Sequence, residues 1–183
     1  MNLNEQAFLA INLGSQASAL WVWLAQEAAT QLLNLTGAAI VLGGVLGRGR
    51  WRTLGRQAAL AMAGGFGAAR LITHLVYLPR PQVLGLGHQW LAHAATSSLP
   101  SAHSTVAAAL GAVWWWALRG SAWRWAGPAL ALLVGWGRVA VGVHFPADVL
   151  AGWLLGAACA GAAIAALPWP PRAQPGTEPL PKP

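Results

Sequence analysis

Residues 137–150 read GRVAVGVHFPADVL, a stretch that is apolar except for three ionisable side chains, Arg138, His144 and Asp148. An ionisable side chain at membrane depth costs about 2.5–3.5 kcal/mol on insertion scales, so such residues are functional by default. His144 and Asp148 are one helical turn apart, which suits a reactive histidine and the carboxylate that orients it. The stretch therefore predicts a reactive site at a junction of membrane helices.

The composition around this stretch is typical of an integral membrane protein. Of the 183 residues, 56% are hydrophobic and only 8% are charged, whereas a soluble domain carries about 25% charged residues. Two uncharged runs, residues 28–47 and 149–171, reach the ~20 residues that a spanning helix needs. The predicted fold class is an all-α, polytopic membrane helix bundle.

The apolar runs predict five spanning helices, at about 28–47, 57–78, 102–118, 125–142 and 149–167. Arginines gather in the first and third connections, and the positive-inside rule places these connections and the C-terminal segment in the cytoplasm. Residues 79–101 and 143–147 then face the opposite side and hold most of the histidines. We expect a multi-pass protein of the cytoplasmic (inner) membrane whose active site faces outward. The arginines concerned are Arg48, Arg50, Arg52, Arg56, Arg119 and Arg124.

The two ends of the chain are expected to lie outside the membrane bundle of residues 28–167. Polar residues interrupt the apolar pattern of residues 1–27, which predicts an N-terminal interfacial helix on the outer surface; a sixth span at about 7–25 is the alternative. Residues 168–183 hold seven prolines, so we expect a disordered cytoplasmic tail. The basic residues form no stripe on a polar face, which excludes nucleic acid as a partner. The sequence does not fix the oligomeric state.

Three outward segments carry polar side chains, and the predicted topology places all three at one membrane face. They are residues 77–81 (YLPRP), 99–104 (LPSAHS) and 138–148. Ser101 is expected to be a helix N-cap and Pro146 to open a helix, so two helix N-termini direct their amides at this face. Arginine forks bind phosphate oxygens and a neutral histidine can attack phosphorus. Together the segments predict an anion site suited to phosphoryl transfer.

These segments resemble the three ordered motifs of the phosphatidic-acid-phosphatase type 2 superfamily of integral-membrane lipid phosphatases, K-x6-R-P, P-S-G-H and S-R-x5-H-x3-D. The resemblance covers residues 70–156. It implies that His144 is the nucleophile that becomes phosphohistidine, that Asp148 orients it, and that His103 acts as general acid and then base. It also implies that no metal or other cofactor is needed. The residues expected to bind phosphate are Arg80, Arg138, Ser101 and, through nearby backbone amides, Ala102.

The first motif departs from the family pattern, because Thr73 occupies the position of its lysine. Arg70 lies one turn earlier and could replace the charge, but helical side chains lean toward the helix N-terminus, which here is away from the site. The sequence therefore also allows a site with one cation fewer. Ala102 in place of glycine, and Gly137 in place of serine, are expected to be mild departures.

Residues 84–106, LGLGHQWLAHAATSSLPSAHSTV, further resemble the branch of the family that dephosphorylates undecaprenyl diphosphate. This resemblance implies hydrolysis of that lipid to its monophosphate, with a role in cell-wall peptidoglycan synthesis and in bacitracin resistance. The alternative is a phosphatase of glycerol-based lipids such as phosphatidic acid or phosphatidylglycerol phosphate, which shares all three motifs. In either case the partners are a lipid phosphate substrate and membrane lipids.

Two other interpretations use the same polar residues. Zinc could be held by His103, His144 and Asp148 with His88 or His93, but two arginines would then lie unfavourably beside a dication. A small lipid or anion transporter would also place arginine and histidine in the membrane, but it would need polar residues along the inner ends of the helices as well. For His88 and His93, solvation near the lipid headgroups is the alternative to a direct catalytic role.

Overall fold

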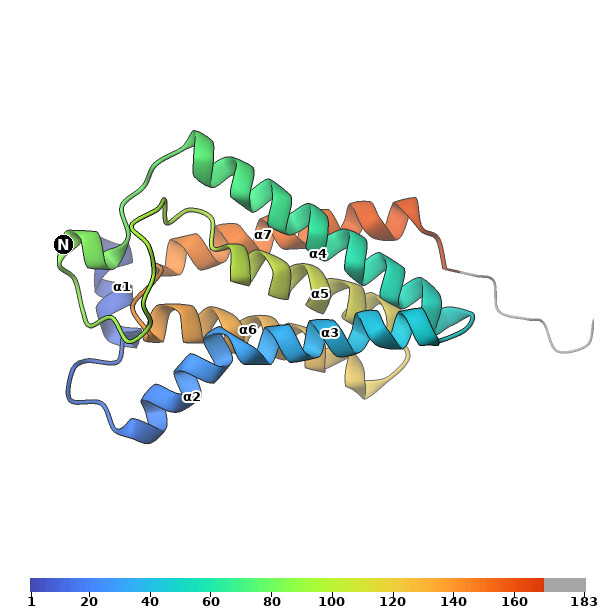
Figure 1. Ribbon diagram of the computed structural model, residues 1–183, viewed down its shortest axis with the longest axis horizontal. Coiled ribbons are helices and arrows are strands. Elements are labelled where there is room, and N and C mark those ends of the chain that lie inside the picture. The colour runs from blue at the N-terminus through green and yellow to red at the C-terminus, as the bar shows by residue number, and fades with distance from the viewer. Residues whose placement is uncertain (170–183) are drawn as a thin grey trace, which may run out of the picture.

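The computed structural model describes residues 1–169, and every regular element in that range is helical. The longer helices run along the molecule, while the N-terminal helix and residues 76–101 gather at one end (Figure 1). The predicted all-α bundle is thus confirmed. The helices are α1 (Leu3–Ile11), α2 (Ala19–Ala29), α3 (Gln31–Leu46), α4 (Arg50–Leu75), α5 (Ala102–Ala117), α6 (Ala126–Ala140) and α7 (Pro146–Ala166), with the 3-10 helices η1 (Pro81–Leu84) and η2 (Ala122–Trp125) in connections.

Each of the five predicted spans corresponds to one of the helices α3 to α7. Three stretches are long and apolar enough to cross a membrane, namely Ala19–Leu46, Arg50–Leu75 and Pro146–Ala166. The largest difference in bounds is the start of α4, which begins at Arg50 and not near residue 57. Arginine is a good helix former, so the basic segment expected to be a loop forms the first turns of α4. The predicted tail lies, from residue 170 onward, outside the described residues.

Residues 1–27 form two helices where the sequence predicted one. α1 ends at Ile11 and α2 begins at Ala19, so no continuous helix covers residues 7–25. The alternative sixth span at 7–25 is therefore not formed. α2 leads into α3 with a break at Thr30, whose hydroxyl donates to the carbonyl of Gln26 at 2.7 Å; a back-bond of this kind bends helices.

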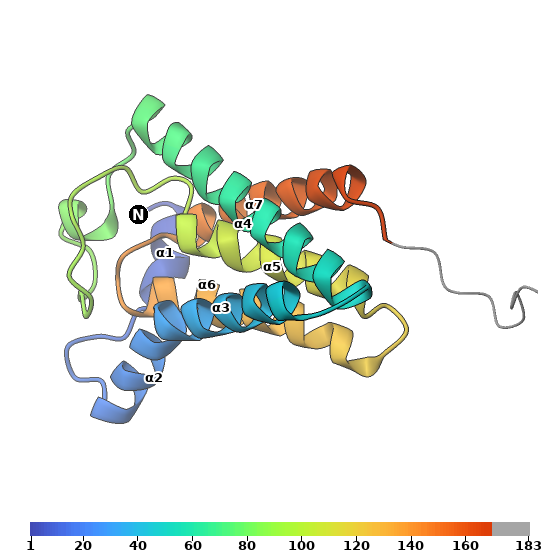
Figure 2. The same ribbon diagram turned by 45° about the vertical axis from the view of Figure 1, so that its right-hand side comes forward.

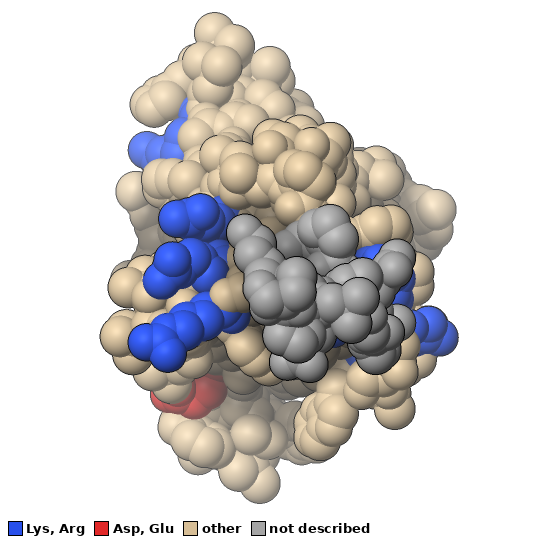
Figure 3. Space-filling view, turned by 90° about the vertical axis from the view of Figure 1, so that its right-hand side faces the viewer, with Lys and Arg blue, Asp and Glu red and all other residues tan. Residues whose placement is uncertain are grey.

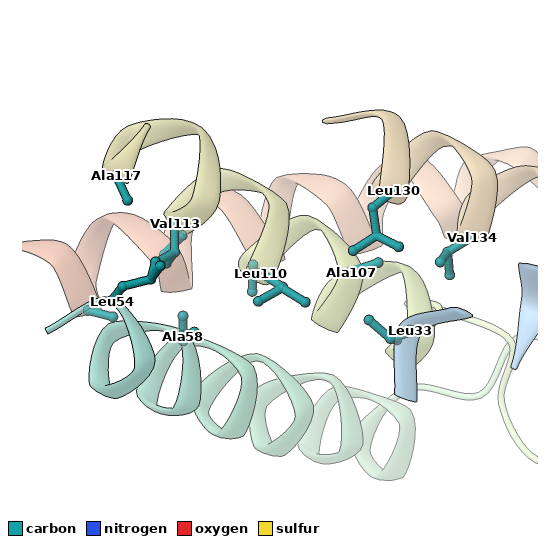
Figure 4. Packing of buried hydrophobic residues seen from close by; sticks show 13 residues of the cluster. Leu33, Leu54, Ala58, Ala107, Leu110, Val113, Ala117, Leu130 and Val134 are labelled. Carbon is teal, nitrogen blue, oxygen red and sulfur yellow. The ribbon is translucent and has the colours of Figure 1, made fainter. Parts of the chain in front are cut away.

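The helices α3 and α4 form a V whose wide end faces the predicted site. They converge beside residues 47–49 and separate toward the other end in both views (Figures 1 and 2). A side chain at Gly44 would meet the backbone of Gly55, so only glycine lets the two helices come this close. The central helix α5 packs against α4, α6 and α7. The core cluster around it contains Leu110 and Val113 of α5 itself (Figure 4). The other helices contribute Leu33 from α3, Leu54 from α4, and Leu130 and Val134 from α6.

Basic side chains lie at the narrow end of the V, opposite the predicted site. Arginine side chains gather on this end of the molecule (Figure 3), where the α3–α4 and α5–α6 connections are located. The positive-inside rule predicts that this end faces the cytoplasm. The orientation in the membrane stays a prediction.

Candidate active site

His144 lies in the short connection between α6 and α7 and is almost fully buried, with 2% of its surface exposed. Its Nδ1 is 3.5 Å from Oδ2 of Asp148, one turn into α7. The same carboxylate oxygen accepts hydrogen bonds from the backbone N–H of Phe145, at 2.8 Å, and from the hydroxyl of Ser98. The structure thus brings the predicted pair together and fixes the carboxylate from two further sides.

Arg80 lies on the opposite side of the His144 ring. Its Nη1 is 3.2 Å from Nε2 of His144 and donates to the carbonyl of Val143 at 2.8 Å. Arginine only donates hydrogen bonds, so Nε2 of His144 is the unprotonated nitrogen and Nδ1, beside Asp148, carries the proton. The remaining donors of Arg80 bind the backbone carbonyls of Thr96 and Ser97, at 3.0 and 2.9 Å. The guanidinium is therefore held rigidly against the nitrogen that would attack phosphorus.

Arg138 is buried at the end of α6, with 1% of its surface exposed. Its Nη1 donates to the carbonyl of Ala29 at 3.3 Å, while its Nε and Nη2 have no partner within residues 1–169. A buried donor without a partner costs about 1–3 kcal/mol. Two such donors on one side of a guanidinium suit the oxygens of a bound phosphoryl group.

Gly137 explains one departure from the family pattern. A Cβ at this position would lie 2.7 Å from the amide nitrogen of Ala29 and 2.9 Å from the carbonyl oxygen of Ala25. Serine would therefore push α2 away from α6. Because α2 also supplies the carbonyl that holds Arg138, glycine at position 137 helps to position the arginine.

The first turn of α5 is tied directly to the first turn of α7. The backbone N–H of Ser101 donates to the backbone carbonyl of Asp148 at 3.0 Å. Ser101 is the N-cap of α5, as predicted, and its hydroxyl accepts from the backbone N–H of Ser104. This connection places Ala102 and half-buried His103 at the end of α5 that is bound to the first turn of α7. Within residues 1–169 no non-glycine residue has positive φ, so alanine at position 102 fits the backbone without strain.

The structure separates the two loop histidines. The ring of His93 packs edge to face against that of His144, with centroids 6.2 Å apart. The ring of His88 instead packs against Trp90, with centroids 4.4 Å apart, and its backbone is bound by Asn12. His93 therefore belongs to the candidate site, whereas His88 belongs to the scaffold around it.

Thr73 and Arg70, the two α4 residues considered for the first motif, have different surroundings. The hydroxyl of Thr73 donates to the backbone carbonyl of Arg70 at 2.7 Å, so this side chain is hydrogen-bonded within α4. Arg70 is exposed, and its side chain forms no hydrogen bond or ion pair within residues 1–169. The structure therefore leaves Arg70 as the available cation on this part of α4.

Sequence reasoning missed the polar contacts made by the segment before Ser101. Ser98 is buried, donates to Asp148 and lies 3.5 Å from Nδ1 of His144. The Thr96 and Ser97 carbonyls hold Arg80. A run of serine and threonine before a helix cap gives no signal that separates these roles from ordinary loop polarity.

The helix α1 was also missed as a support of the site. Phe8 is fully buried and packs edge to face on Phe145, the neighbour of His144, with ring centroids 5.4 Å apart. The side chain of Asn12 donates to the backbone carbonyls of His88 and Ala140, at 2.9 and 3.1 Å. The N-terminal segment thus braces both loops that carry the site.

A cavity of about 280 Å³ lies next to the first turn of α5. It lies between α3, α4 and α5, at the wide end of the V. His103 contributes to its wall, so the cavity reaches the reactive end of α5. Its lining residues are Leu33, Asn34, Met62, Phe66, Ala102, His103 and Val106.

The zinc interpretation finds no donor set here. Within residues 1–169, no three histidine, cysteine, aspartate or glutamate side chains gather closely enough to hold a metal ion. His144 is instead flanked by Arg80 and Asp148. This arrangement suits charge stabilisation by arginine.

Burial lowers the pKa of His144 below that of an ordinary histidine; Asp148 opposes the change, and the positive charges of Arg138 and Arg80 add to it. A group whose pKa is lowered stays uncharged to a lower pH. We therefore expect His144 to remain neutral at about pH 5.5, where a histidine with the ordinary pKa of ~6.5 is mostly protonated. Nitrogen NMR of histidine-labelled protein in nanodiscs would show this, with the His144 signal identified by its loss in His144→Ala. Protonation near pH 6.5 would contradict the buried geometry.

Comparison with known proteins agrees with this geometry. The family model described as the PAP2 superfamily matches residues 54–172. The chain belongs to the PAP2 superfamily. It is a membrane protein and, as the family and its relatives show, a lipid phosphatase.

Two relatives of this PAP2 protein carry more specific names. It is 32% identical over 160 residues, covering 85% of this chain and 78% of the other, to the protein of Escherichia coli (strain K12) named "Putative undecaprenyl-diphosphatase YbjG". It is 39% identical over 80 residues to the undecaprenyl-diphosphatase BcrC of Bacillus subtilis (strain 168), which covers 44% of this chain and 40% of that one.

Two crystal structures share the fold of this PAP2 protein. LpxE of Aquifex aeolicus matches with a TM-score of 0.70 and 21% identity, over 90% of this chain and 96% of that one. A PAP2-type phosphatidylglycerolphosphate phosphatase of Bacillus subtilis matches with a TM-score of 0.60 and 23% identity, over 88% and 83%. At these identities the likeness shows the fold alone.

Proposed function

We propose that this protein hydrolyses undecaprenyl diphosphate to undecaprenyl phosphate at the outer face of the cytoplasmic membrane, through a phosphohistidine at His144. The observation that carries the reaction type is the buried pair of His144 and Arg138. His144 offers an unprotonated nitrogen held against Arg80, and Arg138 offers two donors without a partner. This combination suits phosphoryl transfer, which needs an aligned nucleophile and fixed positive charge.

In the first step, Nη1 of Arg80 moves from Nε2 of His144 to a phosphate oxygen, which frees Nε2 to attack the terminal phosphorus. The bond from that phosphorus to the bridging oxygen breaks. The bonding electrons go to the bridging oxygen, which takes a proton from His103 and leaves as the lipid monophosphate. Asp148 stabilises the positive charge that develops on the His144 ring. Arg80 and Arg138 stabilise the charge on the equatorial oxygens.

In the second step, His103 removes a proton from water and the resulting hydroxide attacks the phosphohistidine. The P–N bond breaks, inorganic phosphate leaves, and His144 regains its neutral form. His103 is then protonated again for the next cycle. One histidine thus serves as acid and base in turn, because the two steps run in opposite directions around the same phosphorus.

The cavity between α3 and α4 supports a lipid substrate. It is mostly apolar, opens at the wide end of the V and has His103 in its wall. A substrate whose phosphate sits at His144 and whose leaving oxygen meets His103 would extend its hydrocarbon chain into this cavity. Because bilayer lipid tails are as apolar as this lining, the chain can enter the cavity from the membrane at little cost.

The choice of undecaprenyl diphosphate is supported by the names of the relatives. The resemblance of residues 84–106 to the same branch agrees with it. The alternative is a glycerol-based lipid phosphate, the kind of substrate named for the phosphatidylglycerolphosphate phosphatase of similar fold. Release of undecaprenyl phosphate would regenerate the lipid carrier of cell-wall synthesis, so higher enzyme levels would raise bacitracin resistance.

Phosphate release from a panel of lipids tests this proposal. The purified full-length protein in detergent is given undecaprenyl diphosphate, phosphatidic acid and phosphatidylglycerol phosphate at equal mole fractions. We expect kcat/KM for the isoprenoid diphosphate to exceed the other two by at least about tenfold, a difference of ~1.4 kcal/mol, and to survive treatment with a chelator. A preference for either glycerol lipid would overturn the substrate while leaving the reaction in place.

A further inference from the structure

A half-buried histidine is fixed beside the nucleophile but has no part in the two steps above. His93 packs edge to face on His144 at 6.2 Å between ring centroids. Its Nδ1 is 3.1 Å from the carbonyl oxygen of Ala94, and its own carbonyl accepts from the side chain of Gln82 at 3.1 Å. Nδ1 therefore carries the proton, and Nε2 has no hydrogen-bond partner within residues 1–169. The loop holds this ring in place with one nitrogen available.

An exposed arginine, Arg70, follows the cavity-lining residues along α4. Met62 and Phe66 line that cavity from α4, and Arg70 follows Phe66 by four residues, which puts it next along the same side of the helix. Helical side chains lean toward the helix N-terminus, so the Arg70 side chain leans toward the cavity. Burial lowers the pKa of His93, and the positive charges of Arg80, Arg138 and Arg70 lower it further. Arg70 thus extends the cavity-lining side of α4 by one turn toward the end of the helix that carries the site.

The basic side chains of the site therefore form two layers. The inner layer, Arg80 and Arg138, is buried around His144 and suits the phosphoryl group that is transferred. The outer layer is His93, which packs on His144, and Arg70, one turn beyond the cavity-lining Phe66, so these two residues bracket the interval between His144 and the cavity. In a lipid diphosphate the second phosphoryl group lies between the reacting phosphorus and the hydrocarbon chain, so it must occupy this same interval.

We propose that Arg70 and His93 bind the phosphate of the leaving group and make the enzyme selective for diphosphates over monophosphates. The inference rests on the proposed function. When the P–O bond breaks, negative charge accumulates on the leaving lipid monophosphate, and Arg70 stabilises it while His103 protonates the bridging oxygen. The bound anion offsets the arginine charges around His93, so Nε2 takes up a proton and donates to the same phosphate. Thr73, at the position of the family lysine, supplies no charge. Arg70 provides a positive charge one turn earlier on α4.

The test compares a diphosphate with a monophosphate on the same enzyme. Purified full-length protein in nanodiscs hydrolyses farnesyl diphosphate or p-nitrophenyl phosphate, and farnesyl monophosphate is measured as a product inhibitor. In Arg70→Ala and His93→Ala we expect the ratio of kcat/KM for diphosphate over monophosphate to fall at least about tenfold, a change of ~1.4 kcal/mol. The inhibition constant of farnesyl monophosphate should rise by a similar factor, and Arg70→Lys should restore most of the ratio.

Matched controls are available on the same elements. Arg56 is an exposed arginine at the other end of α4, and His88 is the loop histidine that packs on Trp90. Arg56→Ala and His88→Ala should keep the wild-type ratio. If Arg70→Ala and His93→Ala lose both activities in equal proportion, or keep the ratio within twofold, the selectivity proposal is wrong. If the wild-type protein does not hydrolyse the diphosphate, the proposed function itself fails.

Discussion

His144→Ala is expected to reduce turnover of a lipid phosphate by about 10³-fold or more, the scale of loss found when a catalytic nucleophile is removed. The buried Nε2 beside Arg80 is the atom placed to attack phosphorus, and no other histidine within residues 1–169 has both a carboxylate at Nδ1 and a guanidinium at Nε2. The measurement is phosphate release by the purified variant, with His88→Ala as the matched histidine control.

Removal of the Ser98 hydroxyl is expected to reduce activity less than removal of the His144 ring. Ser98→Ala removes one hydrogen bond to Asp148 but leaves the bond from Phe145. We expect a loss of about tenfold, near the ~1.4 kcal/mol contributed by one hydrogen bond to a charged group. A Ser98→Ala enzyme as impaired as His144→Ala would show that the serine has a direct role in the reaction.

Arg138→Met is expected to reduce kcat/KM by about 10²–10³-fold, the range found when one charge-stabilising donor is removed from an active site. The same change should raise the melting temperature of the ligand-free protein. The reason is that Nε and Nη2 of Arg138 are buried without a partner, and methionine has no donor to leave unsatisfied. Lower activity together with a higher melting temperature is expected for a residue that binds an anion and does not stabilise the fold.

Thermal unfolding with and without orthovanadate separates the two effects. The wild-type protein should be stabilised by the anion, because a ligand that binds only the folded state raises its stability. Arg138→Met should not respond, whereas Arg124→Ala, at the opposite end of the molecule, should respond like the wild type. A destabilised Arg138→Met protein that still binds vanadate would show that Arg138 has a structural role.

The sequence predicts the long helices well and the N-terminal segment poorly, for a physical reason. Apolar length and charge asymmetry are local properties, and they locate α3 to α7 to within a few residues at most ends. The division of residues 1–27 depends on contacts far away in the chain. Asn12 binds the backbone of His88 and Ala140, and Phe8 packs on Phe145. A sequence pattern does not record such partners.

The same distinction holds for the candidate site. The residues with strong chemistry, such as His144, Asp148 and Arg138, stand out because they are rare in an apolar chain. Ser98 does not stand out, since loop serines are common, and His93 and His88 look alike until the fold places one on His144 and the other on Trp90. The orientation of Arg70 likewise depends on which side of α4 faces the cavity.

The most direct test of the account is to trap the phosphoryl group on the enzyme. His103→Ala lacks the base for the second step, and p-nitrophenyl phosphate has a leaving group that needs no acid, so the intermediate should accumulate. After a brief reaction and denaturation at high pH, where phosphohistidine is stable, mass spectrometry should find one phosphate on the peptide that contains His144. No label should appear in the variant that combines His103→Ala with His144→Ala. A phosphate on another residue, or hydrolysis without any phosphorylated enzyme in His103→Ala, would contradict the central claim.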